Sequence, residues 1–117
     1  MSKHYSESQG LHLNYSIITS LIPNKSNVLD VGCGDGTLMK MLQEKNVHVC
    51  GIDINQDNIV KCLEKGLSVI QGDIDEGLHG YPDKSYDYVV LNKTLLSNKQ
   101  SLENLLKLFS QLLAFPE

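Results

Sequence analysis

The residues of this sequence best suited to chemistry are carboxylates and glycines that alternate in one short stretch. The stretch begins with Asp30 and continues with a glycine at every second position, Gly32, Gly34 and Gly36. Glycines at this density clear side chains from a tight turn, so that a ligand can approach the backbone. The apolar residues Val28, Leu29 and Val31 frame Asp30, and apolar residues at helical spacing follow the turn. We therefore expect a strand, a glycine turn and a helix, an arrangement that binds nucleotides in crossover folds.

The charge of this turn favours one kind of ligand. A dinucleotide pyrophosphate is bound by the spacing G-x-G-x-x-G with no anion nearby. Here the third glycine comes one residue early, and Thr37 occupies the last position of that pattern. Asp30 and Asp35 would repel a diphosphate but attract an ammonium and a sulfonium, and S-adenosylmethionine (SAM) carries both. The spacing and the charge disfavour the alternative of an NAD-dependent oxidoreductase.

Further ligand contacts are predicted where two later strands end. Residues 47–54 are rich in β-branched side chains and predict a strand that ends near Asp53 and Ile54. Asp53 follows the glycine turn by about 20 residues, where an acid can accept the hydroxyls of an adenosine ribose. A third strand over 67–71 is followed by Gly72, Asp73 and Ile74, where an acid can accept the adenine amino group and Ile74 can pack on the ring. The alternatives are that Asp53 caps a helix or is a solvated loop acid, and that Asp73 only begins a polar loop.

The remaining elements are predicted from apolar periodicity. Helices are expected from about residue 9 to 21, from 38 to 45, from 56 to 65, and from near Ser97 onward. The third of these should turn Ile59, Val60 and Leu63 inward, and the last should carry a leucine-rich apolar face. A fourth strand over 86–91 should bring Asn92 to the same edge of the sheet, where the transferred methyl group is expected.

Composition excludes several classes of function. The chain has 117 residues, a hydrophobic fraction of 41% and a net charge of −4, which is enough for a single domain. Its ten basic residues are all lysines and are spread along the chain, so nucleic acid is not expected as a partner. Three cysteines without C-x-x-C spacing suggest neither disulfides nor a metal site. Without a long apolar run or an apolar N-terminus, we expect a cytoplasmic protein away from the membrane.

Four segments together resemble the methionine-biosynthesis protein MetW family, a branch of the class I SAM-dependent methyltransferases. They are NVLDVGCGDGTLMKML, GIDI, GLSVIQGDIDEGL and SYDYVVLNKTL. The resemblance implies a Rossmann-like α/β doubly wound sheet with strand order 3-2-1-4 and SAM at its carboxyl edge. It also implies a link to methionine metabolism and a homoserine O-acyltransferase as a protein partner.

The resemblance also assigns roles to residues of this sequence. Asp30, Gly32, Gly34 and Gly36 match the motif for the methionine end of SAM, Asp53 and Ile54 match the ribose and adenine positions, and Asp73 and Ile74 match a second adenine contact. Cys33 lies within the glycine motif, where a small residue is usual, and we interpret it as a packing residue.

Two departures from the family pattern bear on function. Such domains usually continue through further strands, so we expect residues 1–117 to form a single truncated core in which strand four has a bare edge. The last helix, a second copy of the chain or a partner would then have to cover that edge. Asn92 and Lys93 stand where the family tends to have a Ser-Gln pair.

Two functions fit these residues. One is methyl transfer from SAM to an unidentified acceptor, and the other is a non-catalytic SAM-binding module that regulates a metabolic enzyme. No catalytic base can be named, because His79 and Tyr81 lie in a loop and a lone loop histidine is usually solvated.

Overall fold

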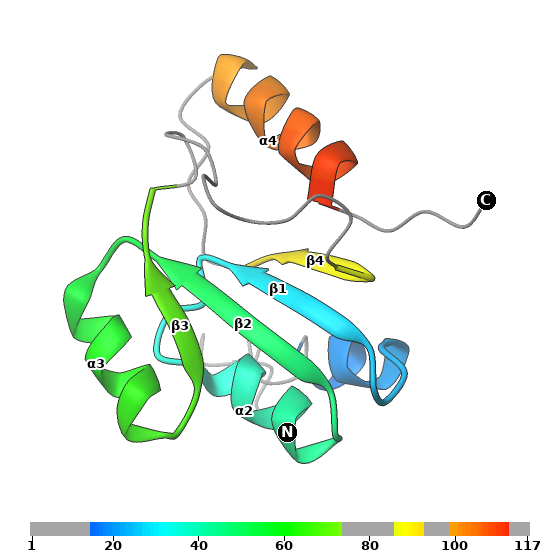
Figure 1. Ribbon diagram of the computed structural model, residues 1–117, viewed down its shortest axis with the longest axis vertical. Helices are drawn as coiled ribbons and strands as arrows, with labels where there is room; N and C mark the ends of the chain where they lie inside the picture. Colours follow the sequence, from blue (N-terminus) through cyan, green and yellow to red (C-terminus); the bar gives the residue numbers. More distant parts are fainter. Residues whose placement is uncertain (1–14, 74–85, 93–98, 113–117) are drawn as a thin grey trace, which may run out of the picture.

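The computed structural model describes residues 15–73, 86–92 and 99–112, and every structural statement below concerns this part of the chain (Figure 1). Four parallel strands form its sheet: β1 (Asn27–Val31), β2 (His48–Asp53), β3 (Ser68–Gln71) and β4 (Tyr88–Leu91). Their order is β3-β2-β1-β4, which confirms the order implied by the family resemblance. β4 begins later than predicted, because Tyr86 forms only an isolated bridge before it.

Helices lie where the apolar periodicity places them. Residues 15–21 are helical, and α2 (Thr37–Glu44), α3 (Gln56–Glu64) and α4 (Lys99–Leu112) follow. α2 stops before Asn46, which has a positive φ of 67°, and Gly66 with a φ of 76° follows α3. Both positions are in the left-handed conformation that commonly ends helices. The predicted start of the first helix lies outside the described residues.

The central strand β1 is buried on both faces of the sheet, which explains its apolar run. One face packs against the helix of residues 15–21, α2 and α3 through two clusters of buried side chains. The first contains Tyr15, Ile22, Val28, Leu38, Leu42 and Val47, and the second contains Cys33, Met39, Cys62 and Leu67. Leu29, Val31 and Ile52 are buried on the opposite face.

The predicted inward face of α3 is wrong. Val60 and Leu63 are exposed, Ile59 is half-buried, and Cys62 is the fully buried residue of this helix. The reason is a close approach between α3 and the glycine turn, since a Cβ atom on Gly36 would lie 3.0 Å from Cys62 Sγ. Only a small side chain fits there, so the helix turns Cys62 inward and the larger Leu63 outward.

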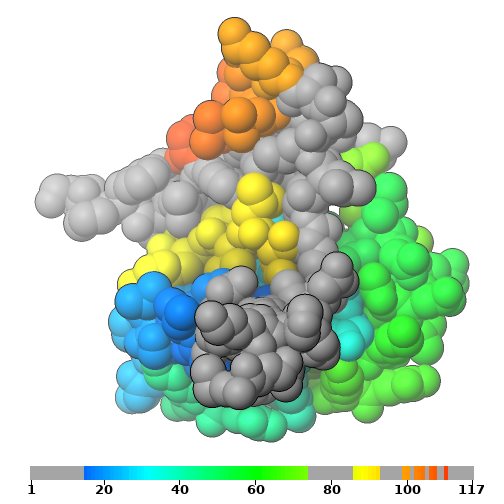
Figure 2. All heavy atoms as spheres, turned by 180° about the vertical axis from the view of Figure 1, so that it is seen from behind, coloured from blue at the N-terminus to red at the C-terminus, as the bar shows by residue number. Residues whose placement is uncertain are grey.

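The last helix stands apart from the sheet in Figure 1, and its predicted apolar face is exposed at Leu102 and Leu106. Seen from behind, β4 reaches the surface between α4 and the helix of residues 15–21 (Figure 2). Tyr88 and Leu91 of β4 are also exposed. None of the described helices is both long and apolar enough to cross a lipid bilayer.

The contact between β2 and α2 gives the first prediction. Gly51 is buried in β2, and a Cβ atom there would lie 2.6 Å from Met39 Sδ and 2.8 Å from Cys33 Sγ. Gly51→Ala should therefore lower the free energy of unfolding by about 1–3 kcal/mol through overpacking. Urea denaturation measures this change.

Gly72→Ala is the matched control, because its added Cβ would have Ile52 Cγ2 as its nearest neighbour, at an ordinary 3.7 Å. This variant should keep or slightly raise the free energy of unfolding. Equal stability of the two variants would contradict the close packing of Gly51.

Candidate functional site

The glycine turn takes its shape from the end of β2. Gly32, Gly34 and Gly36 all have positive φ values, of 73°, 60° and 89°, which other residues rarely adopt. The backbone amides of Gly32 and Cys33 both donate to the carbonyl oxygen of Ile52, at 2.8 Å and 3.0 Å. These backbone conformations therefore explain why glycine occupies all three positions.

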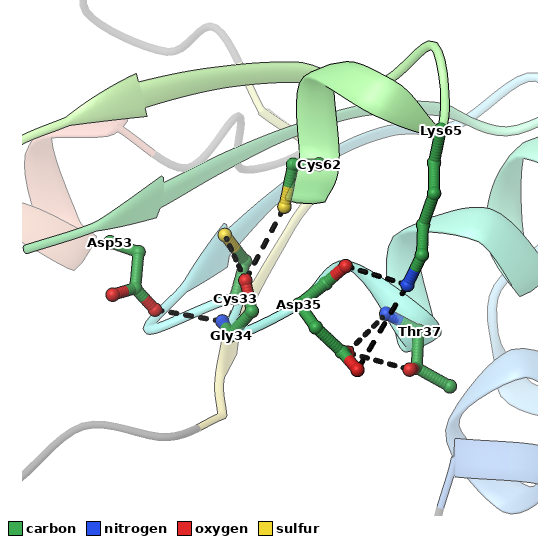
Figure 3. Close-up of polar contacts among 7 residues, drawn as sticks. All are labelled: Cys33, Gly34, Asp35, Thr37, Asp53, Cys62 and Lys65. Atoms are coloured by element: carbon green, nitrogen blue, oxygen red, sulfur yellow. Dashed lines mark hydrogen bonds and ion pairs between the residues drawn. The ribbon is translucent and has the colours of Figure 1, made fainter. Parts of the chain in front are cut away.

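Asp53 pins the middle of this turn (Figure 3). Its Oδ2 atom accepts a hydrogen bond from the amide of Gly34 at 2.7 Å. Its Oδ1 atom accepts from the amide of Asn55 at 2.9 Å and from Asn58 Nδ2 at 3.5 Å. A carboxylate offers about four acceptor positions, so room remains for about one further donor. The cap of α3 is Asn55, whose side chain accepts from the amide of Asn58 at 3.1 Å, and not Asp53.

Asp35 is held by a cation that the sequence analysis missed. Its Oδ1 atom accepts from the amide and the hydroxyl of Thr37, at 3.1 Å and 2.6 Å. Lys65 Nζ donates to the Asp35 carbonyl oxygen at 2.8 Å and lies 3.9 Å from Oδ2 (Figure 3). The turn therefore offers a ligand less negative charge than Asp30 and Asp35 would offer without this lysine.

Asp30 lies beneath the turn and is fully buried. Its Oδ2 atom is 3.4 Å from Asn92 Nδ2, and Asn92 Oδ1 accepts a hydrogen bond from the Tyr15 hydroxyl at 3.0 Å. The amide of Asn92 donates to the carbonyl oxygen of Val31 at 2.9 Å, which fixes it beside β1. Because the Asp30 carboxylate has no exposed surface, we expect it to act on a ligand through its charge and through Asn92.

The thiol of Cys33 points into the core. Cys33 Sγ and Cys62 Sγ both approach the carbonyl oxygen of Gly34, at 3.8 Å and 3.3 Å (Figure 3). Burial is the main cause that raises the pKa of both thiols above the ordinary value, and Cys62 and Asp30 raise that of Cys33 further. A thiol that keeps its proton is a poor nucleophile, which supports the interpretation of Cys33 as a packing residue.

The end of β3 lies against the end of β2. The amide of Gly72 donates to the carbonyl oxygen of Asp53 at 3.1 Å, and Asp73 follows it in a half-buried position. Gln71 Nε2 donates to the carbonyl oxygen of Ile54 at 3.1 Å, while 65% of the Ile54 surface is exposed. The structure thus brings Asp53, Ile54, Gly72 and Asp73 to one edge, next to the glycine turn. Ile74, His79, Tyr81 and Lys93 lie outside the described residues.

Comparison with known proteins assigns the chain to a family. Residues 12–117 match the family model of the methionine biosynthesis protein MetW. The chain belongs to the MetW family. A bifunctional methionine biosynthesis protein MetXA/MetW from Rhodopirellula baltica is 31% identical to this MetW-family chain over 112 residues, which is 88% of this chain and 17% of that protein.

Solved structures show a methyltransferase-like fold. A SAM-dependent methyltransferase from Archaeoglobus fulgidus is 29% identical with a TM-score of 0.69, over 90% of this chain and 49% of that one. A protein from Pyrococcus horikoshii shares the fold at 23% identity with a TM-score of 0.76, over 92% of this chain and 54% of that one. The MetW-family chain therefore spans about half the length of these two structures.

The bonds of Asp53 predict a structural cost for its removal. Asp53→Ala should lower the free energy of unfolding by about 2–4 kcal/mol, because two backbone amides lose a charged acceptor. Asp57→Ala, which removes an exposed acid from the first turn of α3, should cost only about 0.3–1 kcal/mol. Urea denaturation of both variants checks this, and similar losses would contradict the pinning role of Asp53.

The buried thiol of Cys33 predicts a loss of stability at alkaline pH. Its pKa is raised in the folded chain, so the folded state keeps a proton that the unfolded state releases near the ordinary pKa of 9.0. The free energy of unfolding should be at its full value below that pH and should fall as the pH rises above it.

Denaturation under reducing conditions, from neutral pH to about pH 10.5, measures this fall. The free energy of unfolding should fall less steeply with pH in Cys33→Ala than in the wild-type chain. Part of the fall should remain, because burial also raises the pKa of Cys50 and Cys62. An unchanged slope in the variant would contradict the role of Cys33.

Proposed function

We propose that this chain binds SAM along the carboxyl ends of β1, β2 and β3 and aligns its methyl group for transfer to an acceptor. The observation that carries the proposal is the pairing of Ile54 with Asp53. Ile54 is 65% exposed, while Asp53, directly before it, is 7% exposed and carries a carboxylate with acceptor capacity left. An apolar surface beside such an acceptor suits adenosine, because the flat face of its adenine ring packs on apolar side chains and its ribose donates hydrogen bonds.

The side chains present fit this ligand. Asp53 has about one acceptor position free for a ribose hydroxyl. The bond from Asn58 Nδ2, at 3.5 Å, is the longest that Asp53 accepts and the easiest to give up for a second hydroxyl. Gly72 and Asp73 lie next to Asp53, where the adenine amino group is expected. We propose that residues 1–117 act as a single domain in this binding.

SAM supplies an electrophilic methyl carbon whose bond to sulfur breaks as the acceptor's lone pair forms the new bond. The chain's own residues bind and orient the reactants, since alignment and exclusion of water provide most of the catalysis in such a displacement. The glycine turn lines the methionine end of the ligand, and Asp53 and Ile54 hold its adenosine end. Asp30 and Asn92 lie at the other end, at β1 and β4, where the buried charge of Asp30 favours a cation.

An accessory role is the second candidate. In the relative from Rhodopirellula baltica, one chain is named for both MetXA and MetW. The presence of both names on one chain supports a role in which a MetW-family chain works beside a methionine-biosynthesis enzyme, such as a homoserine O-acyltransferase, without transferring a methyl group. Binding of S-adenosylhomocysteine with no methyl transfer to any acceptor would support this role.

The test is calorimetric titration of the purified chain with S-adenosylhomocysteine. Ile54→Ala should weaken binding by about 1–2 kcal/mol because it removes apolar contact with adenine. Because Ile54 is exposed, the same variant should change the free energy of unfolding by less than about 0.5 kcal/mol. Ile54 is a better probe than Asp53, whose removal also disturbs the fold.

Val60→Ala is the matched control, since it trims another exposed apolar side chain, on α3, and should leave binding unchanged. Failure of the folded wild-type chain to bind S-adenosylhomocysteine would overturn the proposal.

A further inference from the structure

We propose that Tyr15 is a positioning residue for the amino-acid end of the ligand, acting through Asn92. This inference rests on the proposed function. The Tyr15 hydroxyl donates to Asn92 Oδ1 at 3.0 Å, and Asn92 Nδ2 lies 3.4 Å from Asp30 Oδ2. Tyr15, in the helix of residues 15–21, is thereby linked to the ends of β4 and β1.

The order of donors and acceptors in this chain of contacts has one solution. The Asn92 amide turns its NH₂ group toward Asp30 Oδ2, where the carboxyl oxygen accepts. The amide oxygen then faces Tyr15, which must donate its hydroxyl proton. A rotated amide would direct its oxygen at the buried carboxylate, which is unfavourable. Tyr15 therefore stabilises the orientation of Asn92 in which the NH₂ group faces Asp30.

Tyr15 itself is held firmly. Its ring is buried in the cluster that contains Val28, Leu38 and Leu42. Its carbonyl oxygen accepts from Thr19 Oγ1 at 2.7 Å, and the carbonyl oxygen of Thr19 accepts from Lys45 Nζ at 2.6 Å. Because Lys45 caps the C-terminal end of α2, the helix of residues 15–21 is tied to the crossover that follows the glycine turn.

The sheet order places Asn92 at the end of the site opposite to adenosine. Asp53 ends β2 and Ile54 follows it, and Gly72 follows β3, whereas Asn92 follows β4 on the other side of β1. Asp30 is fully buried, but Asn92 and Gly32 are half-buried. The amino-acid part of the ligand therefore meets Asn92 rather than the carboxylate behind it, and the hydrogen bond from Tyr15 holds the Asn92 side chain in place.

The test compares two ligands that differ at this end. S-adenosylhomocysteine carries the amino-acid portion, and 5′-methylthioadenosine lacks it. Tyr15→Phe keeps the buried ring and removes only the hydroxyl. By calorimetry, it should bind S-adenosylhomocysteine about fivefold more weakly than the wild-type chain, the usual effect of one lost hydrogen bond, and bind 5′-methylthioadenosine equally well.

Asn92→Ala separates an action through Asn92 from a direct one. It should also weaken the binding of S-adenosylhomocysteine and leave that of 5′-methylthioadenosine unchanged. The double variant, Tyr15→Phe with Asn92→Ala, should bind S-adenosylhomocysteine no more weakly than Asn92→Ala alone. Tyr88→Phe removes a hydroxyl from exposed Tyr88 at the start of β4 and should change neither affinity.

Each outcome decides the matter. Equal weakening of both ligands by Tyr15→Phe, unchanged affinity for S-adenosylhomocysteine, or additive effects in the double variant would overturn the role of Tyr15 while leaving the proposed function intact. A wild-type chain that binds neither ligand would overturn both. If Tyr15→Phe does not fold, the two affinities of Asn92→Ala decide. Equal weakening of both ligands by Asn92→Ala would overturn the role of Tyr15, because Tyr15 is proposed to act through Asn92.

Discussion

The hydrogen bond from the Gly34 amide to Asp53 Oδ2 completes a set on which the site depends. Three successive amides, those of Gly32, Cys33 and Gly34, donate to the last two residues of β2, Ile52 and Asp53. Buried amides need acceptors, so the end of β2 dictates the path of the turn after β1. The same carboxylate holds the amide at the start of α3, so one side chain orders both crossovers.

The three carboxylates around the turn are stabilised in three different ways. Asp30 is buried beside the Asn92 amide, Asp35 is met by Lys65, and Asp53 accepts from backbone amides. A partly exposed ion pair such as Asp35 with Lys65 contributes little stability but reduces the local charge. The charge that a cationic ligand would experience therefore comes mainly from Asp30 and Asp53, which lie at the ends of β1 and β2.

The sequence allowed prediction of those features that depend on neighbouring residues. Apolar runs located β1 and β2, and Gly32, Gly34 and Gly36 located the turn, because backbone conformation and burial leave local patterns. The strand order came from family resemblance. Lys65, Tyr15 and the inward position of Cys62 were missed, because each depends on a contact between segments far apart in the chain. The role of Asn92 as a link between Tyr15 and Asp30 has the same origin.

Among the described residues, four partners of the glycine turn come later in the chain. Ile52 and Asp53 supply its acceptors, Cys62 packs beneath it, and Lys65 holds the carbonyl oxygen of Asp35. During synthesis, a nascent chain that has reached only residue 45 carries the whole motif but none of these four partners. The turn therefore acquires its native form only after about 20 further residues have left the ribosome, at a synthesis rate of about 5–20 residues per second.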